Sequence, residues 1–153
     1  MFNALVLDKG EDDKVTSSIK QLEDGDLPEG DVTIDVAYST LNYKDGLVLE
    51  GLGGLVRNYP HVPGIDFSGT VAESKHSDFK TGDKVILTGW RVGEARWGGY
   101  SQRARVKATG WYICLRVSTK NRPWPLARQA LPQCSPLWPS KHKVSPRTAA
   151  RYW

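Results

Sequence analysis

The sequence has few cysteines and no long apolar run. Only two of its 153 residues are cysteines, too few for a disulfide scaffold, which predicts a protein of the reducing cytoplasm. No apolar run approaches the ~20 residues of a membrane-spanning helix, and the first residues lack the basic start and apolar stretch of a secretory signal. We therefore expect neither a membrane protein nor a secreted one. A hydrophobic content of 39% and a charged content of 25% are those of a globular domain.

Acidic residues are absent from the end of the chain. All 17 Asp and Glu residues lie at or before Glu94, and none occurs in residues 108–153. Residues 1–107 carry 13 basic and 17 acidic residues, a net charge of −4, whereas residues 108–153 carry eight basic residues. The formal net charge of +4 therefore comes from the last 46 residues alone. A basic whole-chain charge does not argue here for a nucleic-acid partner.

The first 107 residues show the pattern of a small β-rich domain. A short helix is predicted within residues 39–50, beginning near Asn42. Turns rich in Gly and Pro recur every ~8–12 residues, as in a barrel or sandwich, so the predicted fold is mainly β with one short helix. Strands are predicted at six apolar or alternating runs, over residues 2–7, 15–22, 32–38, 62–71, 84–87 and 100–107.

Three segments of this region carry distinctive motifs. They are STLNYKD at 39–45, YPHVPGIDFSGTV at 59–71, and GDKV at 82–85 followed by GW at 89–90 and WGGY at 97–100. Together they resemble the medium-chain dehydrogenase/reductase superfamily, and more narrowly its zinc-free acrylyl-CoA reductase and quinone oxidoreductase branch. The resemblance covers residues 1–107 and implies a GroES-like catalytic domain, a partly open barrel. In the family a Rossmann domain that holds NADPH follows, and the enzyme is a homodimer.

The resemblance implies that Asn42, Tyr43 and Lys44 form the catalytic loop. In the family this loop contacts the nicotinamide of NADPH and the substrate, an enoyl-CoA thioester or a quinone. A structural interpretation stays open for each residue: Asn42 caps a helix, Tyr43 packs in the core, and Lys44 is solvated. Asp45 is expected to serve the first turn of the helix, where a carboxylate complements the helix dipole.

The residues at the positions of the zinc ligands argue against a catalytic metal. Zinc-dependent relatives place a cysteine and a His-Glu pair as metal ligands. At what look like the corresponding positions, this sequence has Asn42 and Ile65-Asp66 instead. Residues 1–107 hold no cysteine, and His61 and His76 lack ligand spacing. Hydride addition to an activated double bond then needs hydrogen-bond donors around the substrate carbonyl. Asp66 is expected either to anchor the site from behind or to satisfy the turn.

Three arginines are candidate contacts for the phosphates of a CoA substrate. They are Arg57, Arg91 and Arg96, and for each the alternative is an ordinary surface arginine. Trp90 and Trp97 either wall the substrate pocket or fill the core. Of these residues, Arg57, Arg91 and Trp97 are the predicted substrate-binding residues.

Residues 108–153 form a segment of different composition. They hold six of the nine prolines, four of the six tryptophans and both cysteines, but one of the fifteen glycines. The prolines interrupt any helical or strand period. One functional interpretation is a basic, Trp-rich arm that binds single-stranded nucleic acid. Another is a metal site at Cys114, Cys134 and His142, whose spacing fits no zinc module.

A third interpretation is that residues 108–153 are the family's own coding sequence translated out of frame. Joining the third base of each codon to the first two of the next, from Ala108 onwards, allows the string DWLV-x-LPEGL, which continues the chain as the family would. Later stretches allow MAIGTAG, MALE and VTADSGEIL, similar to the family's helix before its first Rossmann strand. Loss of one nucleotide near the Ala108 codon accounts for this. It predicts a disordered or ill-defined tail and a TGA codon after Trp153.

Under this interpretation the chain is a truncated catalytic domain with little or no reductase activity. It lacks the Gly-rich phosphate loop that holds NADPH, and residues 51–54 do not replace it, since no strand precedes them and no Lys-Ser/Thr follows. The missing remainder is expected to leave an apolar patch and a sheet edge exposed. The alternative function is a stand-alone GroES-like binding module with a nucleic-acid arm. A further alternative is a chaperonin-like ring subunit, and the 51–54 loop is the only feature of the sequence that favours it.

Overall fold

The computed structural model describes residues 1–108 and the backbone of residues 114–116. These residues all lie within one compact unit. No helix in this part of the chain is long and apolar enough to cross a membrane. The elements follow in the order β1 (Phe2–Lys9), β2 (Val15–Leu22), the 3-10 helix η1 (Asp24–Asp26), β3 (Val32–Ser39), α1 (Tyr43–Leu49), β4 (Asp66–Ser74), β5 (Lys84–Thr88), β6 (Arg103–Val106) and β7 (Cys114–Arg116).

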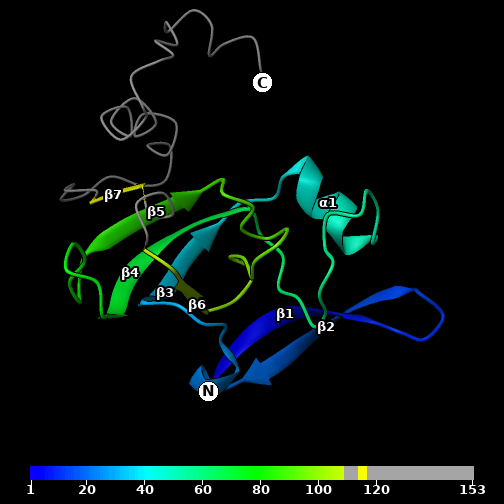
Figure 1. The fold of residues 1–153 in the computed structure, drawn as a ribbon, viewed down its shortest axis with the longest axis horizontal. Coiled ribbons are helices and arrows are strands. Elements are labelled where there is room, and N and C mark those ends of the chain that lie inside the picture. Colours follow the sequence, from blue (N-terminus) through cyan, green and yellow to red (C-terminus); the bar gives the residue numbers. More distant parts are fainter. Residues whose placement is uncertain (109–113, 117–153) are drawn as a thin grey trace, which may run out of the picture. The chain divides into compact units, whose positions relative to one another are not determined.

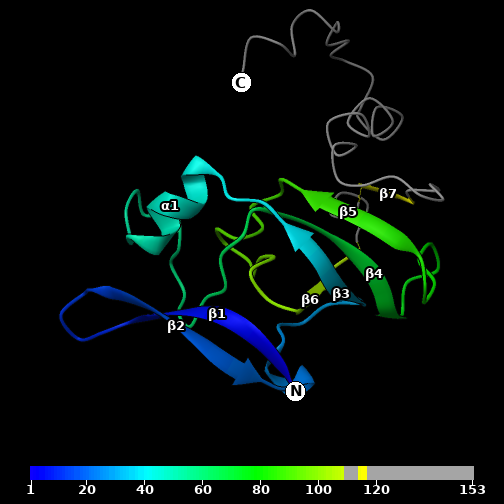
Figure 2. The ribbon, with the colours of Figure 1, turned by 180° about the vertical axis from the view of Figure 1, so that it is seen from behind.

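The strands form two open antiparallel sheets. β1 and β2 make a two-stranded hairpin, and the other strands make a five-stranded sheet in the order β6-β3-β4-β5-β7. Figures 1 and 2 show the hairpin on one side of the described region and α1 beyond the end of β3. The predicted mainly β fold with one short helix is confirmed, and its sheets are open rather than closed into a barrel.

Alternating apolar residues of the central strands make the core. In β4 every second residue from Phe67 to Val71 is buried, because successive side chains of a strand point to opposite faces. A second, smaller cluster lies under the hairpin and includes Phe2, Val6 and Val62. The larger cluster consists of Val32, Ile34, Phe67, Val71, Val85, Leu87, Val92, Ala104, Val106 and Ala108.

Two strands are shorter than the sequence predicts. β4 begins at Asp66 and not at Val62, because Pro63 has no N–H to give to a ladder and Gly64 has a left-handed backbone with φ of 103°. The predicted strand over 100–107 is regular only from Arg103 to Val106. Before it, the carbonyl of Tyr100 accepts a hydrogen bond from Leu5 in β1 at 2.8 Å.

Strand β7 is an element that the sequence analysis does not predict. Arg116 and Cys114 of this strand pair with Val85 and Ile86 of β5. Backbone pairing at a sheet edge needs no apolar periodicity, since the edge offers unpaired N–H and C=O groups to any extended segment. Ala108 is buried in the core, and its N–H donates to the carboxylate of Asp31. The other expectations for 108–153, namely the out-of-frame origin, the ill-defined tail and the Cys114–Cys134–His142 site, lie outside the described residues.

Candidate functional site

The first functional segment leads from the end of β3 into α1. Asn42 is the N-cap residue of α1, with extended backbone angles of −121° and 161°. Its backbone N–H donates to Oδ2 of Asp45 at 2.9 Å. The structural role expected for Asn42, capping the helix, is therefore present. This role leaves the side-chain NH2 group of Asn42 available for other hydrogen bonds.

Asp45 joins the helix to the segment before β4. Its side chain is fully buried. Besides the N–H of Asn42, it accepts hydrogen bonds at Oδ1 from the backbone N–H groups of Gly64 at 3.2 Å and Ile65 at 3.0 Å. Three charge-assisted hydrogen bonds compensate the burial of this carboxylate. Asp45 serves the first turn as expected, and it also sets the position of α1.

Asp66 holds the other side of the same turn. Its Oδ1 accepts hydrogen bonds from Oγ1 of Thr40 at 2.6 Å and from the backbone N–H of Thr40 at 3.2 Å. Its Oδ2 accepts one from Nδ2 of Asn42 at 3.3 Å, and the same amide donates to Oγ1 of Thr40 at 3.1 Å. Asp66 thus satisfies the turn and also orients the Asn42 amide.

Tyr100 completes this cluster and was not among the predicted site residues. Its hydroxyl donates to the carbonyl oxygen of Thr40 at 3.1 Å. Burial raises the pKa of the Tyr100 phenol, and the negative charges of Asp45 and Asp66 raise it further. The hydroxyl therefore stays protonated and remains a donor. The one sequence signal that pointed here was the last residue of the WGGY motif.

Tyr43 and Lys44 point away from the core. Tyr43 is 83% exposed, which excludes the alternative that it packs in the core. Lys44 does not stand alone in solvent, because its Nζ lies 2.7 Å from Oε1 of Glu94. Oε2 of the same carboxylate lies 3.8 Å from Nε of Arg91. The fold therefore brings Lys44 and Arg91, two of the predicted site residues, to one carboxylate that sequence reasoning missed.

Of the remaining candidate substrate residues, Arg96 lies in the same turn as Arg91, and its backbone N–H donates to the carbonyl of Arg91 at 3.3 Å. Arg57 is exposed, and in the described part of the chain it makes no ion pair with an acidic residue. Arg96 is also exposed. Trp97 packs against the cluster under the hairpin, and its Nε1–H donates to the carbonyl of Pro60 at 3.1 Å. Of its two expected roles, filling the core is the one that the contacts show. Trp90 is 44% exposed.

A shallow groove of about 610 Å³ adjoins the cluster. Thr40 and Tyr100 line it, together with Ile19 of β2 and Leu41, which are each 78% exposed. A ligand in this groove would meet apolar side chains beside the polar turn. Apolar lining with a few fixed polar groups is typical of small-molecule sites.

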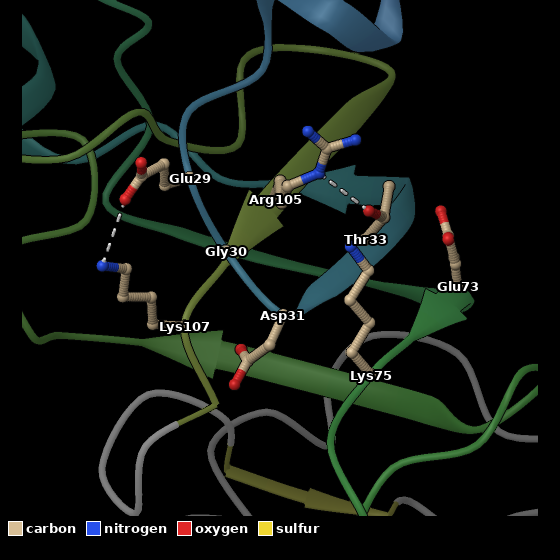
Figure 3. Close-up of a pocket in the computed structure, with 8 residues that line it drawn as sticks. All are labelled: Glu29, Gly30, Asp31, Thr33, Glu73, Lys75, Arg105 and Lys107. Carbon is tan, nitrogen blue, oxygen red and sulfur yellow. Dashed lines mark hydrogen bonds and ion pairs between the residues drawn. The ribbon is translucent and has the colours of Figure 1, made fainter.

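A second cavity, of about 540 Å³, lies at the opposite end of β3 (Figure 3). Charges of both signs balance in it: Lys107 pairs with Glu29 at 3.7 Å, and Nε of Arg105 donates to Thr33 at 3.1 Å. β3 is eight residues long, so this cavity lies roughly 25 Å from the Asn42 turn. It is separate from the candidate site. Its lining comprises Glu29, Gly30, Asp31, Thr33, Glu73, Lys75, Arg105 and Lys107.

Comparison with known proteins decides the family. Residues 28–117 match the alcohol dehydrogenase GroES-like domain. This chain belongs to that family. Over 116 residues the GroES-like chain is 62% identical to an acrylyl-CoA reductase of Ruegeria pomeroyi, covering 75% of this chain and 35% of that protein. It is 45% identical over 115 residues to a putative quinone oxidoreductase of Bacillus subtilis, covering 75% and 34%.

A solved structure agrees with these relatives. The oxidoreductase YhdH of Salmonella enterica, crystallised with NADP, superposes with a TM-score of 0.71 at 47% identity, covering 78% of this chain and 36% of that one. The relatives are oxidoreductases, so the GroES-like chain belongs to an oxidoreductase family. It spans about a third of the length of the curated relatives that it matches.

Of the described residues, Asn42–Lys44 could contact a nicotinamide ring. Asp45 and Asp66 hold this segment by hydrogen bonds, and the Tyr43 side chain is exposed. No phosphate cradle is present in residues 1–108, because the glycines at 51, 53 and 54 follow α1 instead of leading into a helix. Within the same residues no three His, Cys, Asp or Glu side chains gather at a metal-binding distance.

Proposed function

We propose that this chain is the N-terminal catalytic part of an NADPH-dependent reductase. Its reaction is hydride transfer to an activated double bond, as in an acrylyl-CoA-like enoyl thioester, or to a quinone. The observation that carries the proposal is the Asn42–Lys44 turn, which Asp45 and Asp66 hold rigidly beside an open groove. The identity of 62% to an acrylyl-CoA reductase supports the thioester as substrate.

Each residue of the turn has a definite task under this proposal. The Asn42 amide, tied to Thr40 and Asp66, fixes the edge against which the nicotinamide ring rests. The exposed Tyr43 ring covers the reacting carbons and excludes water. The Lys44 ammonium, 2.7 Å from Oε1 of Glu94, attracts an anionic substrate to this turn. The cofactor supplies the hydride when it is bound.

The proposal includes the last residues of the chain. The reading frame changes near Ala108, so that the nucleotide-binding part of the enzyme is not encoded in frame. The buried position of Ala108 supports an intact catalytic fold up to this point. Sequencing the coding DNA is the direct test. An intact frame, with no TGA codon after Trp153, overturns this part of the proposal.

A chimaera tests the catalytic part. Residues 1–108 are joined to the remainder of the Ruegeria pomeroyi reductase, and NADPH oxidation is followed with acrylyl-CoA and with a quinone. We expect the chimaera to turn over at ~1 s⁻¹ or faster, and the present chain not to turn over. Asn42→Ala in the chimaera is expected to lower the rate at least about tenfold. Lys84→Met, at the end of β5 away from Asp66, is expected to leave the rate unchanged. A folded chimaera that reduces neither substrate contradicts the proposal.

A further inference from the structure

A buried carboxylate links two exposed cations that come from different parts of the chain. The Glu94 side chain is 9% exposed, whereas those of Lys44 and Arg91 are 56% and 61% exposed. Lys44 lies in α1 and is fifty residues away in sequence from Glu94. Most surface ion pairs join two flexible side chains and fix neither. Here one partner is immobile, so the ammonium of Lys44 and the guanidinium of Arg91 share one fixed anchor.

The backbone around Glu94 is held from several sides. Trp90 and Arg91 both adopt left-handed φ angles, 55° and 62°, which are uncommon for residues other than glycine and persist only where the surroundings impose them. The N–H groups of Glu94 and Ala95 donate to the carbonyl of Arg91 at 3.2 and 2.9 Å. The buried His61 ring lies 3.0 Å from the carbonyl of Gly93. The turn is therefore a rigid support for the Glu94 carboxylate.

The same support also holds α1. His61 belongs to the segment that Asp45 binds through the N–H groups of Gly64 and Ile65. A Cβ atom on Gly93 would lie 2.6 Å from the carbonyl carbon of Gly64, so the 89–96 turn rests directly on this segment. The backbone positions of Lys44 and Arg91 are thus fixed relative to each other before any ligand binds.

The arrangement leaves donors for an anion. Lys44 uses one of its three ammonium protons on Glu94, and Arg91 approaches through Nε, which leaves its two terminal nitrogens for a ligand. Two cations and one carboxylate carry a net charge of +1. A phosphate group offers several acceptor oxygens and is bound well by fixed N–H donors of lysine and arginine.

We propose that Glu94 is a positioning residue, which orients Lys44 and Arg91 as a two-pronged binding site for the phosphate groups of the substrate. For the kind of ligand, a phosphorylated acyl carrier such as coenzyme A, this inference rests on the proposed function. Glu94 makes no contact with the ligand itself. It acts through the two cations, which are held at one carboxylate only while both remain paired with it.

Binding of coenzyme A and of inorganic pyrophosphate to the present chain tests the inference. Titration calorimetry at one fixed low salt concentration gives the dissociation constants. Lys44→Met and Arg91→Met are each expected to weaken binding at least about threefold, through loss of a charge-assisted contact. Lys20→Met, which breaks the Lys20–Asp8 pair of 2.6 Å on the hairpin, is expected to change binding by less than half as much.

Glu94→Gln separates positioning from simple charge. Removing a negative charge raises the affinity for anions if only the net charge matters, and the matched variant Asp8→Asn makes the same charge change at the hairpin. We expect Glu94→Gln to bind at least about threefold more weakly than Asp8→Asn, because the cations lose their anchor. Glu94→Asp keeps the charge, shortens the reach by one methylene and is also expected to bind more weakly than the parent chain. Thermal unfolding verifies that each variant is folded.

Two results overturn the inference. One is the absence of coenzyme A and pyrophosphate binding by the parent chain at millimolar concentration. The other is a Glu94→Gln affinity equal to or above that of Asp8→Asn. Neither result depends on hydride transfer, so an active chimaera together with a Glu94→Gln affinity equal to or above that of Asp8→Asn rejects this inference and leaves the proposed function standing.

Discussion

His61 illustrates at the scale of one residue how burial controls ionisation. Its side chain is 3% exposed, and its ring lies 3.0 Å from a carbonyl oxygen, which can only accept a hydrogen bond. Nε2 therefore carries the proton of a neutral imidazole. Burial lowers the pKa of His61 below its usual value of 6.5, and the hydrogen bond to Gly93 opposes this in part.

Folding stability should fall in mild acid because of this histidine. The unfolded chain takes up a proton below about pH 6.5, and the folded chain does so only at lower pH, so the free energy of unfolding drops as the pH falls through this interval. Urea unfolding between pH 8 and pH 5 measures the slope. His61→Gln is expected to flatten it. Equal slopes in His61→Gln and the parent would contradict the prediction.

At the scale of elements, the candidate site depends on contact between two irregular segments. The backbone N–H of Gly98 donates to the carbonyl of Val62 at 2.7 Å, and that of Gly99 donates to the carbonyl of Gly64 at 3.0 Å. A Cβ atom on Gly98 would collide with the carbonyl oxygens of Pro63 and Gly64. Backbone packs against backbone here, and only glycine permits that distance.

Substituting alanine at two glycines should give effects of opposite sign. Gly98→Ala is expected to lower the free energy of unfolding by about 3 kcal/mol, because the added methyl forces the two segments apart. Gly46→Ala, in α1, meets nothing within 4 Å and is expected to raise it by about 0.5–1 kcal/mol through helix propensity. Chemical unfolding of both variants measures the difference. A Gly98→Ala variant as stable as the parent would show that the contact can relax freely.

At the scale of the whole molecule, the change of composition at Ala108 coincides with a packed end of the core. Ala108 is 4% exposed, and the buried residues of β6, Ala104 and Val106, lead up to it. Upstream of this point, buried and less buried residues alternate along β5 and β6 and through the first part of β4. Downstream, acidic residues are absent and prolines are frequent.

Limited proteolysis should divide the chain near this point. We expect a resistant fragment that ends close to Lys107 and rapid loss of the remaining residues, because an out-of-frame segment, as proposed above, carries no selected pattern for packing against this core. Mass spectrometry of the digest identifies the boundary. Cleavage within residues 1–107 at the same rate, or protection of the whole chain, would contradict the out-of-frame interpretation.

Local pattern sufficed for most of the elements. β1, β2, β3 and β5 lie where the sequence predicts strands. The start of β4 did not follow from pattern, because the apolar run from Val62 continues through residues that cannot join a ladder. Side-chain alternation records which face is buried, and it does not record which backbone groups have a partner.

The sequence by itself determined the fold class, the position of the Asn42–Lys44 turn and the compositional change after residue 107, since these depend on neighbouring residues and on motif spacing. Only the tertiary structure decided that Lys44 and Arg91 both pair with Glu94, and that the Tyr100 hydroxyl donates to the carbonyl of Thr40. Contacts between residues fifty or sixty positions apart arise when the core brings their segments together. No local pattern encodes that distance, because it depends on how the sheets and the turns between them pack.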